Sequence, residues 1–369
     1  MLPNRFPELE DALPEGANEF QLIHLKTKLR KCRRLVYKKP KSKGTQEYDR
    51  VTPHLFILAY EGLAVFAMEA FLYEGQDDSV TTLFVSKADT TGHYYGSASL
   101  SIARVTRALI RVLLRYYAQP ADKVRVCLFA KAENQYLFPL SSKNPKKHVQ
   151  SDASLVKWWL RVLDPLKDEF GSLTKARLQI PGADSKAIEA FFPRPSTMDW
   201  SVGDVFSDNG NIAAVKCIPR FPDDPKVRFL DYLVSERRAL KTPREQFWIE
   251  LQARQEFRLG SVVGIIGIEG TLPSRNEQLR ASVAEPHEVR YRKLKTLREA
   301  LVSCDYSTIE SAKDAHDFLT ERITTPFSIL TIKGKHRAQQ KRPADAAVAA
   351  PINTLSGGMV RKKAKKTSS

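Results

Sequence analysis

The order of apolar and polar residues along the chain predicts alternating strands and helices. Short apolar, β-branched runs at Thr81–Ser86 and Val124–Phe129 are typical of strands, and residues 99–117 between them repeat apolar side chains at helical spacing. A strand, a helix and a second strand in this order are the usual components of a mixed sheet. We therefore expect an α/β fold.

Further apolar stretches extend this pattern. Leu55–Tyr73 has near-helical spacing, although strands are also compatible with parts of it, and it belongs to the core in either case. The chain is long enough for one large domain or two of ordinary size. The remaining expected elements are extended pieces at Gln135–Phe138 and Cys217–Phe221, helices at 151–164, 225–238 and 242–259, and a buried strand at Ser261–Gly270.

Three segments are expected to lie outside this regular core. Residues 26–43 are basic and contain no acid, which indicates a solvated loop or hairpin, and residues 170–208 are rich in Pro, Gly and Asp, which indicates an irregular surface excursion. Beyond Ile332 the composition turns to Lys, Arg, Ala, Gln and Ser. We expect a single catalytic domain over 1–337 and a disordered basic tail over 338–369. Such a tail directs nuclear import, docks on an acidic surface or is inert.

Charge and cysteine usage narrow the function classes. A net charge of +17 and a pI near 9.6 favour an acidic partner such as nucleic acid, chromatin or a phosphate-rich cofactor. The four cysteines are far apart and no secretory leader precedes them, so we expect reduced thiols in the cytosol or nucleus. No apolar run reaches the length of a membrane span, and no spacing of Cys and His indicates a metal site. We expect neither a membrane nor a metal.

The segment whose side chains are best suited to take part in a reaction is Arg220–Leu230. It places Asp223 and Asp224 between two prolines, on a backbone that the proline rings stiffen. One of the carboxylates could act as a general base near neutral pH. Alternatively, Asp224 caps a helix that begins at Pro225, and the pattern by itself favours this second interpretation.

Two other places could carry chemistry. In Val85–Ser101, small residues precede the helix, so that a phosphate could approach its first backbone amides, but an ordinary capped turn fits equally well. In Lys143–His148, lysines could pair with phosphate, and one of the tryptophans in the helix that follows could wall an apolar channel. A tryptophan on a helix is more often part of the core. Residues alone leave these alternatives open.

Five blocks of sequence occur along the chain in this order: Val85–Gly92, Gln135–Phe138, Lys143–Val149, Lys157–Leu160 and Phe221–Lys226. In content and in order they resemble the fungal Rtt-type histone lysine acetyltransferases. The resemblance covers most of residues 20–335 and implies a central mixed β-sheet surrounded by helices, as in the CBP-type acetyltransferases, with acetyl-CoA as donor. Residues 170–208 do not align, and the tail matches only in being basic.

The resemblance also implies roles for individual residues. Asp224 corresponds to the proton acceptor, with Asp223, Asp89, Trp159 and Tyr136 near the catalytic tunnel. Lys226 corresponds to a lysine that the family acetylates on itself, and its acetylation would remove a positive charge beside the aspartates. The positions implied for acetyl-CoA are Ala88, Asp89, Thr90, Ser97, Ala98, Ser99, Leu100, Ser101, Phe129, His148, Val149, Gln150 and Trp158.

By resemblance, the protein is expected to transfer acetyl from acetyl-CoA to lysine of newly made histone H3, paired with H4, in the nucleus. Expected partners are histone chaperones of the anti-silencing-function and nucleosome-assembly types, with links to nucleosome assembly, DNA damage, genome stability and transcription regulation. The alternative is a non-enzymatic basic protein that binds chromatin or nucleic acid. A third possibility is an acetyltransferase for another basic protein or small amine.

Overall fold

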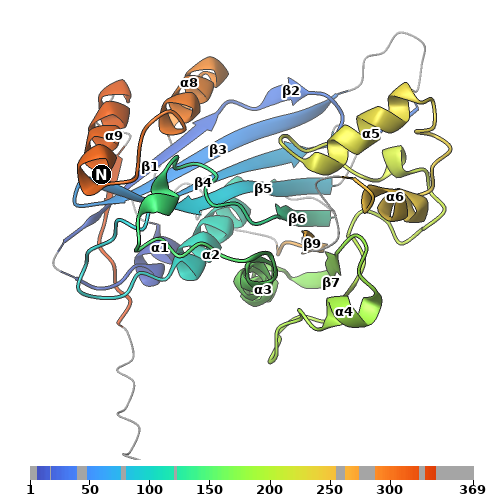
Figure 1. The fold of residues 1–369 in the computed structure, drawn as a ribbon, viewed down its shortest axis with the longest axis horizontal. Helices are drawn as coiled ribbons and strands as arrows, with labels where there is room; N and C mark the ends of the chain where they lie inside the picture. The colour runs from blue at the N-terminus through green and yellow to red at the C-terminus, as the bar shows by residue number, and fades with distance from the viewer. Residues whose placement is uncertain are drawn as a thin grey trace, which may run out of the picture. The chain divides into compact units, whose positions relative to one another are not determined.

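The strands of the described chain pair into one mixed sheet (Figure 1). The pairs β1–β10, β5–β6 and β7–β8 are parallel and the other pairs are antiparallel, which confirms the expected mixed sheet. In spatial order the strands are β10 (His287–Val289), β1 (Phe20–Thr27), β3 (Asp49–Tyr60), β4 (Leu63–Glu74), β5 (Val80–Thr90), β6 (Lys123–Ala130), β9 (Gly264–Thr271), β7 (Ser172–Gln179) and β8 (Trp200–Val202), while β11 (Ile329–Ile332) pairs with β1 and β2 (Arg30–Cys32) with β3.

This computed structural model describes residues 6–16, 18–39, 48–75, 80–119, 123–254, 262–273, 287–323 and 329–337. Residues up to Arg337 form one compact unit. The expected tail over 338–369 lies outside the described residues, as do 40–43 of the basic run, 255–259 of an expected helix and Ser261 of an expected strand.

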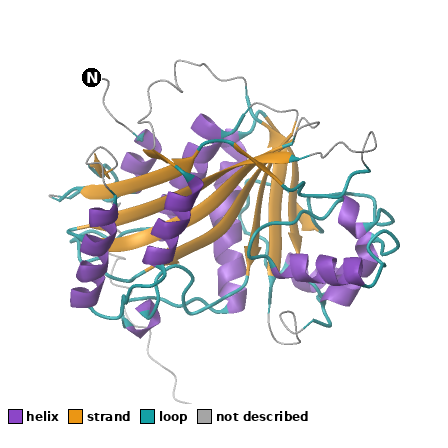
Figure 2. Ribbon diagram, turned by 90° about the horizontal axis from the view of Figure 1, so that it is seen from above, coloured by secondary structure: helices purple, strands orange, loops and turns teal. Residues whose placement is uncertain are grey.

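Helices cover both faces of the sheet (Figure 2). One face packs against α1 (Pro7–Ala12), α2 (Ile102–Val112) with a π-helical turn at Leu113–Tyr117, and α3 (Asp152–Leu163). On the other face, α8 (Tyr291–Leu301) and α9 (Ile309–Arg322) cover β1, β3 and β4, and α5 (Pro225–Ser235) and α6 (Arg244–Leu251) cover β5, β6 and β9. A short α4 (Ser185–Glu189) and 3-10 turns at 141–143, 164–169 and 214–216 complete the described helical elements.

Burial on both faces explains why the central strands are apolar without alternation. In β5, Leu83 and Val85 belong to the core beneath α2 and α3, whereas Phe84 between them belongs to the core beneath α5 and α6. A strand covered on both sides gains from apolar residues at every position. The same argument accounts for Leu55–Tyr73, where near-helical spacing was misleading. That stretch is the hairpin of β3 and β4, joined by a turn with positive φ at Glu61 and Gly62.

The irregular surface excursion expected at 170–208 is partly wrong. It contains β7, which pairs with β9 in the main sheet, and β8, whose Trp200 is buried. In β7, buried Ala176 and Leu178 alternate with Lys175 and Arg177, which contact carboxylates on the opposite face. This period of two was the overlooked strand signal.

Smaller differences concern the ends of elements. The strand expected at Thr81–Ser86 continues to Thr90, and part of the basic run 26–43 is strand rather than loop. The helices expected at 225–238 and 242–259 correspond to the shorter α5 and α6. Gln135–Phe138 and Cys217–Phe221 form no strand, because the first wraps around a carboxylate and the second inserts apolar side chains into the core beneath α5.

Candidate active site

A cavity of about 570 Å³ lies where β5 and the loop that follows β6 meet α2 and α3. Parallel strands direct their carboxyl ends to the same edge of a sheet, where ligands commonly bind. The chain leaves β5 at Thr90 and enters α2 at Ile102, so residues 92–102 form one wall of the cavity. Residues 133–150 and Trp158 of α3 form another.

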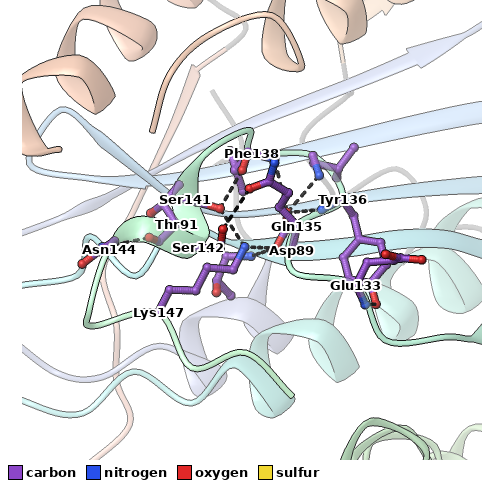
Figure 3. A network of polar contacts seen from close by, with 12 residues as sticks. Asp89, Thr91, Glu133, Gln135, Tyr136, Phe138, Ser141, Ser142, Asn144 and Lys147 are labelled. Carbon is purple, nitrogen blue, oxygen red and sulfur yellow. Dashed lines mark hydrogen bonds and ion pairs between the residues drawn. The ribbon is translucent and has the colours of Figure 1, made fainter. Parts of the chain in front are cut away.

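Asp89 organises the second wall (Figure 3). Its Oδ2 accepts hydrogen bonds from the amides of Tyr136, Leu137 and Phe138 at 2.7, 2.9 and 3.2 Å. Its Oδ1 accepts from the Thr90 amide and from Lys147 Nζ, each at 2.8 Å. Five donors occupy this buried carboxylate, so Asp89 holds the loop in place and has little capacity left for further hydrogen bonds.

The loop at 141–147 is fastened to the residues that follow β5. Asn144 Nδ2 donates to the carbonyl of Thr91 at 2.9 Å, and Lys147 Nζ donates to Ser141 Oγ at 2.7 Å (Figure 3). Gly92 has a φ of +79°, and a Cβ there would lie 2.6 Å from the Lys147 backbone nitrogen. Close packing and backbone conformation together require glycine at this position.

Aromatic residues also line the cavity. Tyr136 donates its hydroxyl hydrogen to the Lys131 carbonyl at 2.5 Å and accepts from the Glu133 amide at 2.9 Å. Burial raises the pKa of the Tyr136 phenol, which therefore stays neutral. Trp158 faces the cavity, and Trp159 packs edge-on against it with ring centroids 4.8 Å apart.

The cavity gathers most of the positions that the resemblance implied for acetyl-CoA. Ser101 and Phe129 do not line it, and Phe129 packs instead against the core beneath α5 and α6. Trp159, Asp223, Asp224 and Lys226 also lie outside its lining. The lining includes Ala88, Asp89, Thr90, Ser97, Ala98, Ser99, Leu100, Tyr136, His148, Val149, Gln150 and Trp158.

Asp224 lies at the start of α5, in the geometry of a capped helix. Its Oδ1 accepts from the Lys226 amide at 3.1 Å, and Pro225 is the first helical residue. Its Oδ2 forms an ion pair with Lys226 Nζ. The side chains of Asp224 and Lys226 are 0% and 2% exposed, so the pair is sealed from solvent in this conformation.

Lys226 occupies an unusual environment for an ammonium group. Its Nζ lies 4.8 Å from the ring centroid of Phe221 and 5.9 Å from that of Phe206. Burial lowers the pKa of Lys226 to about 7, against the opposing effects of Cys127 and Asp204. A lowered pKa makes the neutral, nucleophilic form of a lysine easier to reach, whereas the adjacent Asp224 carboxylate favours the charged form.

Asp223 is held differently from its neighbour. Its side chain is 60% exposed, and its Oδ2 lies 2.5 Å from Lys87 Nζ and 3.0 Å from Arg298 Nη2. Lys87 chiefly, with help from Arg298, lowers the pKa of Asp223 despite partial burial. Arg220, at the start of the same segment, places its Nε 3.6 Å from Asp231 Oδ1.

Several residues of the cavity and of the turn with Asp223 and Asp224 were not predicted from the sequence. Lys147 was noted only as a possible phosphate ligand, whereas it pairs with Asp89, and Lys87 and Arg298 were not connected with the acidic turn. Glu69 and Lys87 interrupt apolar strands, and that interruption was the available signal. Further lining residues of the cavity are Val65, Phe66, Gly92, Tyr94, Gly96, Ile102, Glu133, Asn134, Lys146, Lys147 and Leu155.

Within the described ranges, no group of three or more His, Cys, Asp or Glu side chains is placed to hold a metal ion. Among the helices that the structure describes, none is long and apolar enough to cross a membrane.

The fold and the sequence are similar to known acetyltransferases. Residues 7–121 and 114–326 match the histone acetyltransferase KAT11-type domain. Histone acetyltransferase rtt109 of Schizosaccharomyces pombe is 32% identical over 280 residues, which are 71% of this chain and 71% of that protein. RTT109 of Candida albicans is 29% identical over 315 residues, 70% of this chain and 84% of that protein.

A solved structure supports the same relationship. The crystal structure of Rtt109 from Aspergillus fumigatus matches with a TM-score of 0.75 and 25% identity, covering 90% of this chain and 99% of that one. Members of this family are enzymes, so the alternative of a non-enzymatic binding protein is set aside. Their reaction implies acetyl-CoA as acetyl donor. This chain belongs to the KAT11-type histone acetyltransferase family and is a histone lysine acetyltransferase of the fungal Rtt109 type.

Proposed function

We propose that this enzyme acetylates lysine of newly made histone H3, presented together with H4 by a histone chaperone in the nucleus. Chaperones of the anti-silencing-function and nucleosome-assembly types are the proposed partners, which links the reaction to nucleosome assembly and genome stability. The enzyme carries a net charge of +17 and is repelled by free histone, which is also basic. An acidic chaperone that masks the histone charge removes this repulsion.

Acetyl-CoA is proposed to bind in the 570 Å³ cavity. Ser101 makes no side-chain cap at the start of α2, so the first amides of that helix suit the phosphates of the donor. Small side chains at 96–99 allow a ligand to approach the backbone there. Tyr136 and Trp158 supply the apolar wall that a pantetheine arm and an acetyl group require. Asp89 keeps this wall in position.

The chemistry needs a proton acceptor. A lysine of pKa about 10.4 is almost wholly an ammonium ion at neutral pH and must lose a proton before its nitrogen attacks the thioester carbonyl. The tetrahedral intermediate then collapses, the C–S bond breaks, and the sulfur leaves as thiolate. Asp224 is the proposed acceptor, because its carboxylate is buried and its only ion-pair partner in the described chain is a single side chain.

Lys226 is proposed to control Asp224. The observation that carries this proposal is the sealed pair of Asp224 and Lys226, in which the ammonium occupies the carboxylate. Acetylation of Lys226 removes its charge, ends the ion pair and frees Asp224 for the substrate proton. The lowered pKa of Lys226 supplies the neutral amine that self-acetylation requires.

The acceptor is tested by comparing three substrates at equal concentration: H3 alone, the H3–H4 complex, and H3–H4 bound to an acidic chaperone. Mass spectrometry of the acetylated lysines gives the rate at each site. We expect the chaperone-bound complex to react at least ten-fold faster in kcat/KM than the free histones. Equal rates would refute the chaperone proposal, and faster reaction with another basic protein would refute the proposed acceptor.

A further inference from the structure

The turn that carries Asp223 is held by cations from two other elements. Lys87 of β5 and Arg298 of α8 both contact its Oδ2. Arg298 also places its Nε 2.6 Å from Glu69 Oε1 of β4, and Lys87 Nζ lies 3.7 Å from Glu69 Oε2. Two cations and two anions thus alternate around a square, which we call the charge square of Glu69, Lys87, Asp223 and Arg298. Each charge has two opposite neighbours, which balances the group.

Asp223 needs such support because of its backbone. It has a φ of +53°, a left-handed conformation that costs a non-glycine residue on the order of 1 kcal/mol. Surrounding contacts must hold a residue in this conformation. The next residue is Asp224, whose backbone is extended and whose carboxylate caps α5. Any relaxation at Asp223 therefore moves Asp224 and the ion pair with Lys226.

The four members of the charge square are not equally fixed. Glu69 and Lys87 are cross-strand partners within the sheet, so their backbones are set by the β4–β5 ladder. Arg298 arrives from α8, on a segment 75 residues beyond Asp223. Without Arg298, Lys87 alone would face two carboxylates, and the buried one, Glu69, would compete with Asp223 for it.

We propose that Arg298 is a positioning residue for acetyl transfer, which holds Asp223 and through it the turn that sets Asp224. This inference rests on the proposed role of Asp224 as proton acceptor. A guanidinium suits the task because its separate nitrogens bind Glu69 and Asp223 at once, in a fixed geometry. A lysine at 298 supplies one point charge and satisfies one carboxylate well.

The test is a double-mutant cycle with Arg298→Met and Asp223→Asn, with kcat measured at saturating acetyl-CoA and histone complex. We expect Arg298→Met to lower kcat about ten-fold or more, since small displacements of catalytic groups are costly. The KM for acetyl-CoA should change less than about two-fold, because Arg298 lies outside the cavity lining. The double variant should be no slower than Asp223→Asn alone, and Arg298→Lys should recover part of the loss.

Lys295→Met is the matched control, because Lys295 lies on the same helix and its exposed side chain pairs with Glu299 of its own helix. It should leave kcat unchanged. Losses that add in the double variant, or equal changes in kcat and in acetyl-CoA KM, would overturn the inference in favour of a general structural role. If Arg298→Met does not fold, Arg298→Lys in the same cycle gives the same decision.

Asp224→Asn separates this inference from the proposed function. If Asp224→Asn is nearly inactive while Arg298→Met keeps full kcat, the positioning role is wrong and the proton acceptor stands. If Asp224→Asn keeps full kcat, the proton acceptor is wrong and the positioning role falls with it. Loss of kcat in both variants, together with non-additive losses in the double-mutant cycle, supports both the proton acceptor and the positioning role.

Discussion

Asp89 and Asp224 are two buried carboxylates that belong to adjoining parts of the molecule and are held in opposite ways. Counted over the whole residue, Asp89 is 6% and Asp224 4% exposed, so burial does not distinguish them. Asp89 is surrounded by four backbone amides and one ammonium, whereas Asp224 has one amide and the ammonium of Lys226. Backbone donors cannot be removed without unfolding a loop, but a single lysine can be neutralised. Asp89 is therefore suited to holding the loop in place, and Asp224 to accepting a proton once its lysine is neutralised.

The largest expected effect follows from replacing Asp224, the proposed proton acceptor. Asp224→Asn keeps a good helix cap but cannot accept a proton, so we expect kcat to fall about 100-fold or more while acetyl-CoA binding persists. Steady-state kinetics across pH, with a thermal-shift assay for acetyl-CoA, provide the measurement. Asp231→Asn, a change at an exposed position of the same helix, is the control. Unchanged turnover in Asp224→Asn would remove the distinction between the two carboxylates.

Replacing Asp89, the carboxylate that holds the loop, should instead lower stability and acetyl-CoA binding. Asp89→Asn replaces one acceptor oxygen with a donor and removes the charge opposite Lys147, so either the three loop amides or the Thr90 amide and Lys147 lose their acceptor on this side chain. We expect a loss of about 2–4 kcal/mol in the free energy of unfolding, together with a reduced thermal shift by acetyl-CoA. Urea denaturation measures the first quantity. Asp184→Asn, at the exposed cap of α4, should be nearly neutral. A stable Asp89→Asn with normal donor binding would contradict the structural role.

Lys226 sharpens the comparison because its own charge can be titrated. The folded-state pKa of about 7 lies below the unfolded value of about 10.4, so the unfolded chain binds more protons between these limits. The contribution of Lys226 to stability therefore rises with pH from about 7 to about 10, by at most about 1.4 kcal/mol per pH unit. Lys226→Met should remove this rise, and Lys241→Met, at an exposed position, should not.

The same lysine tests control of the reaction. Self-acetylation of Lys226, followed by mass spectrometry, should be half-maximal near pH 7. Lys226→Arg keeps a positive charge beside Asp224 and cannot be acetylated, so its turnover on histone should fall. Full activity of Lys226→Arg would show that the ion pair does not regulate Asp224.

The sequence predicted the parts of this contrast that depend on local pattern. The capped start of α5 followed from Asp224 and Pro225, and the helix with the tryptophan pair followed from the signals at its two ends, Ser151 and Asp164–Pro165. The mixed sheet followed from β5, α2 and β6 in order. The limits of strands were predicted poorly where a strand is buried on both faces, as in β3 and β4, because a continuous apolar run has no clear period.

Long-range partners could not be predicted from pattern at all. Lys87 and Arg298 lie 136 and 75 residues from Asp223, and only the folded sheet and the packing of α8 bring them together. The amides that hold Asp89 have no side-chain signature, since any residue type supplies a backbone donor. The resemblance named Asp89 as a site residue, but only the structure shows which atoms occupy its oxygens.

The smallest expected effect concerns the loop that Asp89 fixes. Gly92→Ala places a Cβ 2.6 Å from the Lys147 backbone nitrogen at a positive φ, whereas Gly62→Ala, with a φ of +73°, meets nothing within 4 Å. Both variants incur the backbone cost of about 1 kcal/mol, and only Gly92→Ala must also displace the loop. We expect Gly92→Ala to be less stable than Gly62→Ala by about 1 kcal/mol and to bind acetyl-CoA more weakly. Equal stabilities would mean that the loop yields readily, and the contrast between a fixed Asp89 site and an adjustable Asp224 site would then be weaker.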